Sequence, residues 1–385
     1  MGDQDESQPV ALNLPATPVI SAGGAFTCLL STAGRIVCWG RVAAAAADSF
    51  WRPVQIGDAA GEPFAAVAVG DNACALTTSG RAYCWGGVNN HGQLGTGTRT
   101  PAATPTAVAG GLRFVAIAVG AGLTCALTAR GQTYCWGRGE GGIFGGERDT
   151  PRDRYVPTLI AATDGLQAIE AGSVVCGLAR SGVPLCWGEA TGSFDPGAWI
   201  EPGVCQSRYF IRFEERGCSS PTPVEGSPVL RTITTGGETA CGVAADGQAW
   251  CWGGGWLGTL GNGTAGSRTH AVKPVRVSRF GDFTSVSAGA THVCGLRATG
   301  DIVCWGNNFR GYLGRGTREP GASEPAPISS SRRFVALASG WAHVCAIDVD
   351  AAVWCWGQGE TGALGRSPQV GDAFAPVEVE GLRAH

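Results

Sequence analysis

The tripeptide Cys-Trp-Gly occurs seven times along this chain of 385 residues. Each of these cysteines follows another cysteine ten residues earlier, and successive units begin 46 to 65 residues apart. A period of about 50 residues indicates an array in which each unit is one small supersecondary structure. The cysteine pairs are Cys28 and Cys38, Cys74 and Cys84, Cys125 and Cys135, Cys176 and Cys186, Cys241 and Cys251, Cys294 and Cys304, and Cys345 and Cys355.

Each unit contains short runs that are typical of β-strands. In the third unit, residues 114–119 are rich in β-branched and aromatic types, and runs at 124–128 and 132–136 follow between glycines. Such runs predict strands, whereas no stretch of the unit has helical periodicity. A proline is expected at the first position of a fourth strand, where its missing N–H is tolerated. These prolines are Pro53, Pro105, Pro157, Pro223, Pro274, Pro327 and Pro376.

The sequence therefore predicts an all-β fold, a seven-bladed β-propeller of four-stranded blades with the strands ordered from inner to outer along the chain. Residues 9–385 form this single domain, and residues 1–8 are expected to be disordered. A loop insertion at about 192–220 enlarges the fourth unit. Residues 9–12 resemble a spare outer strand that competes with 376–379 for the place at the edge of the last blade.

The hairpin between the paired cysteines is the best-defined local structure. In the second unit the loop Thr78-Ser79-Gly80 places glycine at the left-handed position of a type I turn with a bulge, so Cys74 faces Cys84. Directly opposed residues lie near the separation that a disulfide needs, though slightly wide of it. We expect one disulfide per unit and a further one between Cys205 and Cys218. The alternative is fourteen reduced cysteines that act as small core residues.

Composition limits the environment and the partners. Disulfides of this number predict an oxidising compartment, either extracellular, cell-surface or periplasmic. No signal peptide is visible, and Met1, the only methionine, suggests a start codon added to a mature sequence. The net charge of −3 gives no reason to expect nucleic acid, and no apolar run is long enough to span a bilayer. Lys273 is the only lysine among 28 basic residues, which points to a bacterial genome. We expect a monomer.

The repeats resemble those of the RCC1 (regulator of chromosome condensation 1) family. The matching pattern is clearest between Val286 and Gly314, and its Asn-x-x-Gly-x-Leu-Gly part recurs between Asn89 and Gly95. The resemblance covers nearly the whole chain and implies a propeller of RCC1-like blades. The nuclear member of that family is a nucleotide exchange factor that touches chromatin. Another branch holds secreted bacterial proteins, including a propeller that inhibits β-lactamases with loops on one face, and the cysteines place this chain nearer that branch.

Departures from the repeat pattern mark candidate binding residues. The Leu-Gly turn is replaced by a run of alanines in the first unit and by the insertion in the fourth. Trp341 stands in the turn that follows the first strand of its unit. In the other six units we align it with Ala25, Asp71, Ala121, Ser173, Glu238 and Ala290. Aromatic residues and arginine at variable sites are typical anchors of protein interfaces, although local packing is the alternative for each. The predicted partner-binding residues are Trp51, Trp199, Tyr209, Phe210, Trp256, Phe309, Arg310, Tyr312 and Trp341.

Other motifs carry little chemistry. Two Gly-x-Gly-x-x-Gly segments begin at Gly137 and Gly357, but they follow predicted strands and lead into turns, so we expect no dinucleotide there. His292 and His343 occupy equivalent turn positions, where a structural hydrogen bond is the simpler explanation. The sequence has no Cys-x-x-Cys pair, so it gives no indication of a zinc site. We expect no catalytic residue, no cofactor and no metal ion.

The predicted function is binding of a protein or peptide by loops on a rigid propeller, as an inhibitor, receptor or adhesion protein. One alternative is a guanine nucleotide exchange factor-like regulator of a small GTPase, which would require reduced thiols. The other is an extracellular enzyme with a site in the central channel or in the insertion, which clustered carboxylates or a bound metal would indicate.

Overall fold

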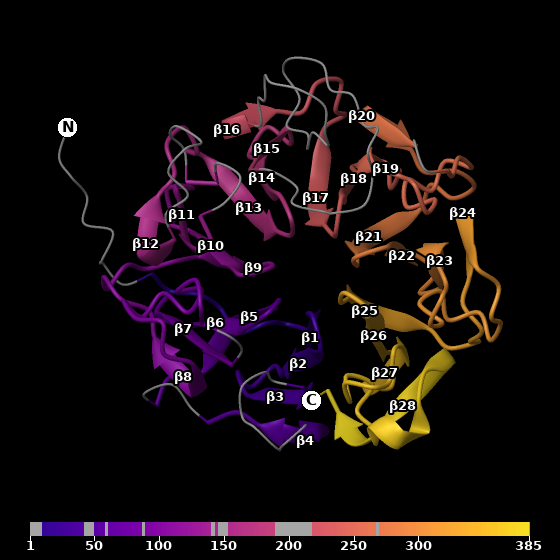
Figure 1. Ribbon diagram of the computed structural model, residues 1–385, viewed down its shortest axis with the longest axis horizontal. Helices are drawn as coiled ribbons and strands as arrows, with labels where there is room; N and C mark the ends of the chain where they lie inside the picture. The colour runs from indigo at the N-terminus through magenta and orange to yellow at the C-terminus, as the bar shows by residue number, and fades with distance from the viewer. Residues whose placement is uncertain are drawn as a thin grey trace.

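Seven four-stranded antiparallel sheets surround a central channel in the computed structural model of the protein (Figure 1). The structure describes residues 10–41, 50–57, 61–86, 89–139, 143–144, 153–188, 218–266 and 269–384. The prediction of a seven-bladed all-β propeller is therefore confirmed. The expected disordered segment 1–8 and most of the insertion lie outside the described residues.

The first four blades are continuous in sequence. Blade 1 holds β1 (Val19–Ala22), β2 (Phe26–Leu30), β3 (Ile36–Gly40) and β4 (Phe50–Gln55). Blade 2 holds β5 (Phe64–Val69), β6 (Ala73–Thr77), β7 (Ala82–Gly86) and β8 (Ala102–Ala107). Blade 3 holds β9 (Ala116–Val119), β10 (Leu123–Leu127), β11 (Thr133–Gly137) and β12 (Arg154–Leu159). Blade 4 holds β13 (Leu166–Ala171), β14 (Val175–Ala179), β15 (Pro184–Gly188) and β16 (Cys218–Pro223).

The last three blades follow the same plan. Blade 5 holds β17 (Leu230–Thr235), β18 (Thr239–Ala244), β19 (Ala249–Gly254) and β20 (His270–Arg276). Blade 6 holds β21 (Phe283–Ala288), β22 (His292–Arg297), β23 (Ile302–Asn307) and β24 (Gly321–Pro327). Blade 7 holds β25 (Phe334–Ser339), β26 (His343–Asp348), β27 (Ala352–Gly357) and β28 (Ala373–Arg383), with the short 3-10 helix η2 (Pro368–Val370) before β28. The first strand of every blade lines the channel, which confirms the inner-to-outer order.

The paired cysteines face each other on the second and third strands of every blade. All seven pairs form disulfides, and the Cα atoms of each pair lie 4.1 Å apart. This separation is short rather than wide as we expected, because the cysteines occupy close, non-hydrogen-bonded positions of the ladder. The expected bridge between Cys205 and Cys218 depends on a residue outside the described part of the chain.

The outer-strand prolines do not stand at the first position of the fourth strand, as the sequence suggested. In blade 1, Cys38 pairs with Val54 and Gly40 pairs with Phe50. The outer-strand residues 51–53, of which Pro53 is the last, therefore oppose Trp39 alone. A bulge of this kind leaves residues without ladder partners, which suits proline because it has no N–H. In blades 4 and 6 the equivalent residues are Pro221 and Pro325, not Pro223 and Pro327.

The hairpin turns have the predicted conformation. The glycine at the left-handed position has a positive φ in the first six blades, for example 77° at Gly80. In blade 7 this position is Ala351, whose φ is 61°. The buried Asp348 carboxylate stabilises this turn, because it accepts hydrogen bonds from the backbone N–H groups of Asp350 and Ala352 and from the Trp354 indole.

The tryptophans of the Cys-Trp-Gly segments are buried between blades, and four of them donate their indole N–H to the preceding blade. The acceptor is the backbone carbonyl just before the leucine of the Leu-Gly turn, at distances of 2.8 to 3.0 Å. The donor and acceptor pairs are Trp39 and Ala363, Trp136 and Gln93, Trp305 and Thr259, and Trp356 and Tyr312.

Two of the other three tryptophans have a buried indole N–H without any hydrogen-bond partner among the described residues. Trp85 and Trp187 follow the first and third units, where the Leu-Gly turn is missing or altered. In both cases, the unit that departs from the repeat pattern directly precedes the blade whose indole N–H has no described partner.

A ring of seven glycines brings the blades together at the exit of the inner strands. A Cβ atom on any of them would lie within 2.8 Å of the carbonyl oxygen of the corresponding glycine in the next blade. Only glycine allows backbones to approach this closely. The ring consists of Gly23, Gly70, Gly120, Gly172, Gly236, Gly289 and Gly340, and the last of them closes on the first.

Blades 1 and 7 close the propeller through contacts rather than through a shared sheet. The Trp341 N–H donates to the Gly23 carbonyl oxygen at 3.0 Å, and His343 Nε2 lies 2.7 Å from Thr27 Oγ1. β28 alone forms the outer edge of blade 7. The suggestion that residues 9–12 compete for that edge is wrong, because Leu12 donates its N–H to the Thr78 carbonyl and packs in the second blade's part of the core.

Candidate functional site

Two sets of connections lie on one face of the propeller. Antiparallel strands alternate in direction, so the turn after each first strand and the loop after each third strand emerge on the same side. The disulfide hairpin turns emerge on the opposite side. We call the side that carries the turns after the first strands and the loops after the third strands the loop face. The six predicted partner-binding residues that the structure describes belong to its connections or to the strand starts that follow them.

In blades 2 and 6, a buried asparagine holds the loop after the third strand in place. In blade 6, Asn308 donates hydrogen bonds to the carbonyls of Thr317 and Glu319 and accepts one from the Leu313 N–H. Asn89 makes the equivalent three bonds in blade 2. The repeated asparagine is therefore structural, and it fixes the residues beside it.

Phe309 and Trp341 are the predicted residues most available to a partner. The side chain of Phe309 is 77% exposed and that of Trp341 is 49% exposed. Arg310, beside Phe309, forms ion pairs with Glu360 at 2.6 Å and with Asp372 at 3.5 Å. These pairs connect the loops of blades 6 and 7, so the surface around Phe309 spans two blades.

Other predicted residues pack within the propeller. Tyr312 is only 9% exposed and stacks on the His292 ring, with the ring centroids 5.1 Å apart. Trp51 is partly buried beneath the Arg52 guanidinium, 4.5 Å from the ring centroid, and Gly362 of blade 7 packs against it. Trp256 is partly buried in the loop before β20. Local packing, the alternative that we weighed for each, describes Tyr312 best.

Three further predicted residues, Trp199, Tyr209 and Phe210, lie outside the described residues. The alignment around Trp341 needs a correction in two blades. The glycine ring shows that Gly24 and Gly237 correspond to Trp341, not Ala25 and Glu238, since the N–H groups of both glycines donate to the next blade's ring carbonyl.

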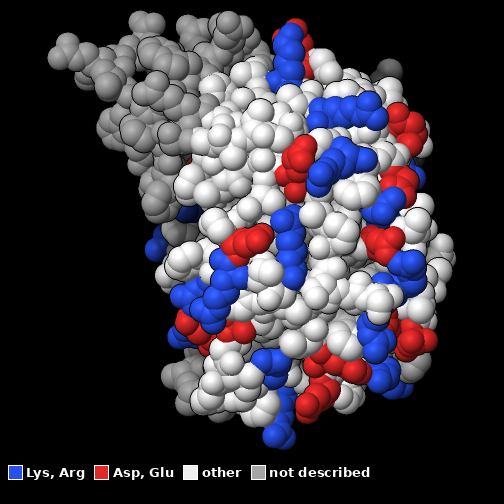
Figure 2. Space-filling model, turned by 90° about the vertical axis from the view of Figure 1, so that its right-hand side faces the viewer, with Lys and Arg blue, Asp and Glu red and all other residues white. Residues whose placement is uncertain are grey.

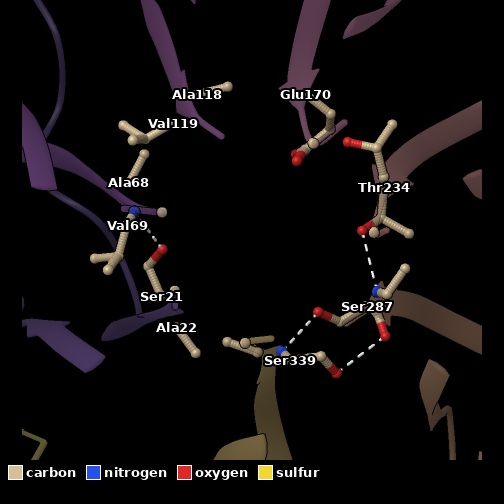
Figure 3. Close-up of a pocket in the computed structure, with 18 of the residues that line it drawn as sticks. Ser21, Ala22, Ala68, Val69, Ala118, Val119, Glu170, Thr234, Ser287 and Ser339 are labelled. Atoms are coloured by element: carbon tan, nitrogen blue, oxygen red, sulfur yellow. Dashed lines mark hydrogen bonds between the residues drawn. The ribbon is translucent and has the colours of Figure 1, made fainter. Parts of the chain in front are cut away.

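The mouth of the central channel opens within the loop face. The channel encloses a cavity of about 310 Å³ that is lined by the seven inner strands and by Trp341. Glu170, on β13, is the one ionisable side chain among the described residues that line it, and its carboxylate points into the channel (Figure 3). Burial raises the pKa of this carboxyl from 4.5 to about 7. Sequence reasoning missed Glu170, although aligning the inner strands would have set it against serine, threonine and alanine.

Acidic and basic side chains are interspersed over the side of the molecule that Figure 2 shows, which is the right-hand side of Figure 1. Many of them pair, such as Arg297 with Asp282 at 2.8 Å and Arg383 with Glu378 at 2.7 Å. This side therefore carries no large field of one sign. At the channel rim, Asp71 has its pKa raised mainly by burial.

The histidines noted in the sequence are buried. His343 bonds to Thr27, as a structural role predicts, and burial lowers its pKa to about 4. Burial also lowers the pKa of His292 to about 3, and this ring stacks on Tyr312 without a hydrogen bond to a described residue. Gly137 and Gly357 end strands β11 and β27. Across the described ranges, no group of three His, Cys, Asp or Glu side chains is arranged to hold a metal ion.

Family comparison agrees with the geometry of the blades. The model described as "Regulator of chromosome condensation (RCC1) repeat" matches residues 79–127, 246–296 and 299–347, and a second RCC1 repeat model matches 283–311. The chain contains RCC1 repeats in these segments. Each segment that the first model matches begins at a hairpin turn of one blade and ends on the second strand of the next, so it contains one Cys-Trp-Gly tryptophan and one glycine of the ring.

Curated proteins with RCC1 repeats are similar to this chain in part. The ultraviolet-B receptor UVR8 of Arabidopsis thaliana is 28% identical over 306 residues, which cover 76% of this chain and 64% of that protein. The human E3 ubiquitin-protein ligase HERC2 is 34% identical over 170 residues, which cover 43% of this chain and 4% of that protein. The chain thus spans less than two thirds of these relatives.

Solved structures share the fold. Prp20p of Saccharomyces cerevisiae, described with its binding to Gsp1p and histones, superposes with a TM-score of 0.75 at 20% identity, covering 98% of this chain and 88% of that one. A second structure, of yeast RCC1 (Prp20) bound to Kap60, gives a TM-score of 0.76 at 19% identity over 99% and 89% of the two chains. Within the described residues, no helix has the length and apolar character of a membrane span.

Proposed function

We propose that this RCC1-repeat propeller is a protein-binding platform that works outside the cytoplasm and engages a protein or peptide with its loop face. The observation that carries the proposal is the exposure of Phe309 and Trp341 on loops whose backbones are fixed. Large aromatic side chains on preorganised loops bury apolar area at a low cost in conformational entropy.

The related proteins support a binding role. Prp20 is described with Gsp1p, histones and Kap60 as its ligands, and UVR8 is named as a receptor. A scaffold that holds loops on one face is common to these repeats, whereas the partner varies between proteins. We therefore propose a protein partner without transferring any of theirs.

The cysteines support the extracellular or periplasmic location. Each blade has its own disulfide, and such a set does not persist in a reducing cytosol. The same observation argues against the alternative of a nucleotide exchange factor in the cytosol or nucleus. Intact mass before and after alkylation, under denaturing and non-reducing conditions, tests this point for all 16 cysteines. A protein made in an oxidising compartment that still alkylates fully would overturn the proposed location.

Matched variants on the two faces test the binding proposal. Phe309→Ala and Trp341→Ala remove exposed aromatic rings from the loop face. Val349→Ala removes a side chain that is 63% exposed at a hairpin turn on the opposite face. Cross-linking to proteins of the native surroundings, read by quantitative mass spectrometry, should give a partner that the Val349 variant keeps and the other two lose. Partners retained by all three variants would refute binding through the loop face.

A further inference from the structure

The inner strands of six blades place a small, uncharged side chain at the position that pairs with the first cysteine. In the fourth blade this position holds a glutamate. The seven residues are Ser21, Ala68, Ala118, Glu170, Thr234, Ser287 and Ala338. Alanine is sufficient in three blades, so the packing of a blade does not require a carboxyl group here.

The hydroxyl groups at this position join neighbouring blades. Ser21 accepts a hydrogen bond from the Val69 N–H at 3.0 Å, and Ser287 accepts one from the Ser339 N–H at 2.8 Å (Figure 3). Thr234 does the same for the next blade. The Glu170 carboxylate has no hydrogen bond or ion pair with any residue that the structure describes, and burial is the sole cause of its raised pKa. Among the described residues, Glu170 therefore does not join neighbouring blades as these hydroxyl groups do.

An unpaired carboxylate inside a protein is unfavourable unless a cation or a hydrogen-bond donor satisfies it. Water and solutes reach Glu170 only through the channel, because the blades enclose it on all other sides. The described residues that line the channel include no lysine, arginine or histidine that could serve as its partner. Among the described parts of the chain no side chain satisfies Glu170, which leaves channel water or a solute that enters the channel.

Glu170 and Trp341 both line the cavity, and β13, which carries Glu170, stands on the opposite side of the channel from β25, which ends just before Trp341 (Figure 1). Glu170 stands two residues before its ring glycine, Gly172, and Trp341 stands directly after its own, Gly340. Both residues are thus at the loop-face end of the channel. An indole ring attracts an ammonium group through its π-face and also packs well against a methylene chain.

We propose that the loop-face mouth of the channel binds a primary alkylammonium group, with its charge at the Glu170 carboxylate and its methylene stem against Trp341. The cavity of about 310 Å³ is large enough for such a group and lies at the lower end of the range for small-molecule sites. The source of the ammonium is either a lysine side chain of a protein partner or a free amine. The first source rests on the proposed function and would place that partner's lysine at the centre of the loop face.

The test uses 1-aminopentane as the probe and needs no protein partner, so it can succeed or fail independently of the proposed function. Isothermal titration of the full chain at pH 8, where both groups are charged, should show saturable binding at a single site. Glu170→Gln should weaken binding by about tenfold or more, since it leaves the ammonium without its counter-charge. Trp341→Ala should weaken it by roughly fivefold.

Two controls make the result specific to the channel. Pentan-1-ol has the same stem without the charge and should not bind measurably. Glu225→Gln removes one negative charge from the opposite face, where Glu225 pairs with Lys273, and should leave the affinity unchanged. Equal binding by the wild type and Glu170→Gln, or no saturable binding at millimolar amine, would overturn the proposal.

A second pair of probes separates the two sources. Nα-acetyl-lysine methylamide presents the same ammonium on a blocked backbone. Tighter binding of this compound than of 1-aminopentane supports a partner's lysine, and tighter binding of 1-aminopentane supports a free amine. Both results retain the ammonium site, and failure of both probes rejects it.

Discussion

The glycine ring makes a sharp prediction about what holds the propeller closed. A Cβ atom at Gly70 would lie 2.5 Å from the Val119 carbonyl oxygen and 2.7 Å from the Gly120 carbonyl oxygen. Ordinary contacts of a Cβ begin near 3.4 Å, so blades 2 and 3 would have to separate by about 0.9 Å at the channel. Both obstacles are backbone atoms, which cannot rotate away as a side chain can.

The expected cost of Gly70→Ala follows from these distances. Overpacking of this kind costs about 1–3 kcal/mol, and separating the blades also strains the hydrogen bond from the Asp71 N–H to the Gly120 carbonyl, worth about 1 kcal/mol. Alanine has less conformational freedom than glycine in the unfolded chain, which offsets about 0.5 kcal/mol of this cost. We therefore expect the free energy of unfolding to fall by about 2–3 kcal/mol.

Urea unfolding followed by tryptophan fluorescence measures this difference, and Gly57→Ala is the matched control. A Cβ atom at Gly57 would have nothing within 4 Å, and this glycine lies in an exposed connection, so its substitution should leave stability unchanged or raise it slightly. If Gly70→Ala proves as stable as Gly57→Ala, close backbone contact at the ring is not what joins the blades.

Three more predictions concern stability, and each is read from urea unfolding. Replacing Cys74 and Cys84 together by alanine should cost about 2–3 kcal/mol by freeing an 11-residue loop in the unfolded chain, and an unchanged midpoint would contradict a formed disulfide. The Glu170 carboxyl takes up a proton on folding, because its pKa rises from 4.5 to about 7. As the pH rises from 4.5 to 7, the free energy of unfolding of the wild type should therefore fall by about 2 kcal/mol relative to that of Glu170→Gln, after allowance for channel water. Parallel pH profiles of the two proteins would refute this. Ala351→Gly should stabilise by about 0.5–1 kcal/mol by relieving a φ of 61°, and a loss of stability would show that the turn needs the methyl group.

Sequence reasoning reached the architecture because covalent and steric requirements recur in every unit. The spacing of ten residues between cysteines sets the hairpin register, and the glycine before the third strand sets the turn, so Cys74 was paired correctly with Cys84. The same reasoning wrongly put the proline at the start of the outer strand in every blade, and in blades 4 and 6 it also chose the wrong proline. There, two prolines stand two residues apart, and only the register shows that Pro221 and Pro325 enter the bulge.

The candidate site was harder to predict, for two physical reasons. The ring glycine stands five residues before the cysteine in five units but four residues before it in blades 2 and 4. A count of three residues back from the cysteine, which suits blades 2 and 4, therefore gave the wrong equivalents of Trp341 in blades 1 and 5. Exposure also depends on neighbours that are distant in sequence. Phe309 and Tyr312 belong to the same loop, yet one is 77% exposed and the other is covered by His292 and its surroundings.

Two recurring contacts between blades end on backbone atoms, and this explains how the side chains of the loop face can vary. The indole of each paired tryptophan binds a carbonyl oxygen, not the side chain of the residue that carries it. That residue is glutamine, threonine, tyrosine or alanine in the four blades concerned, with no change in the bond. The glycine ring likewise uses only backbone atoms. Side chains on the loop face are thus free to be selected for a partner while the same backbone contacts keep the blades in place.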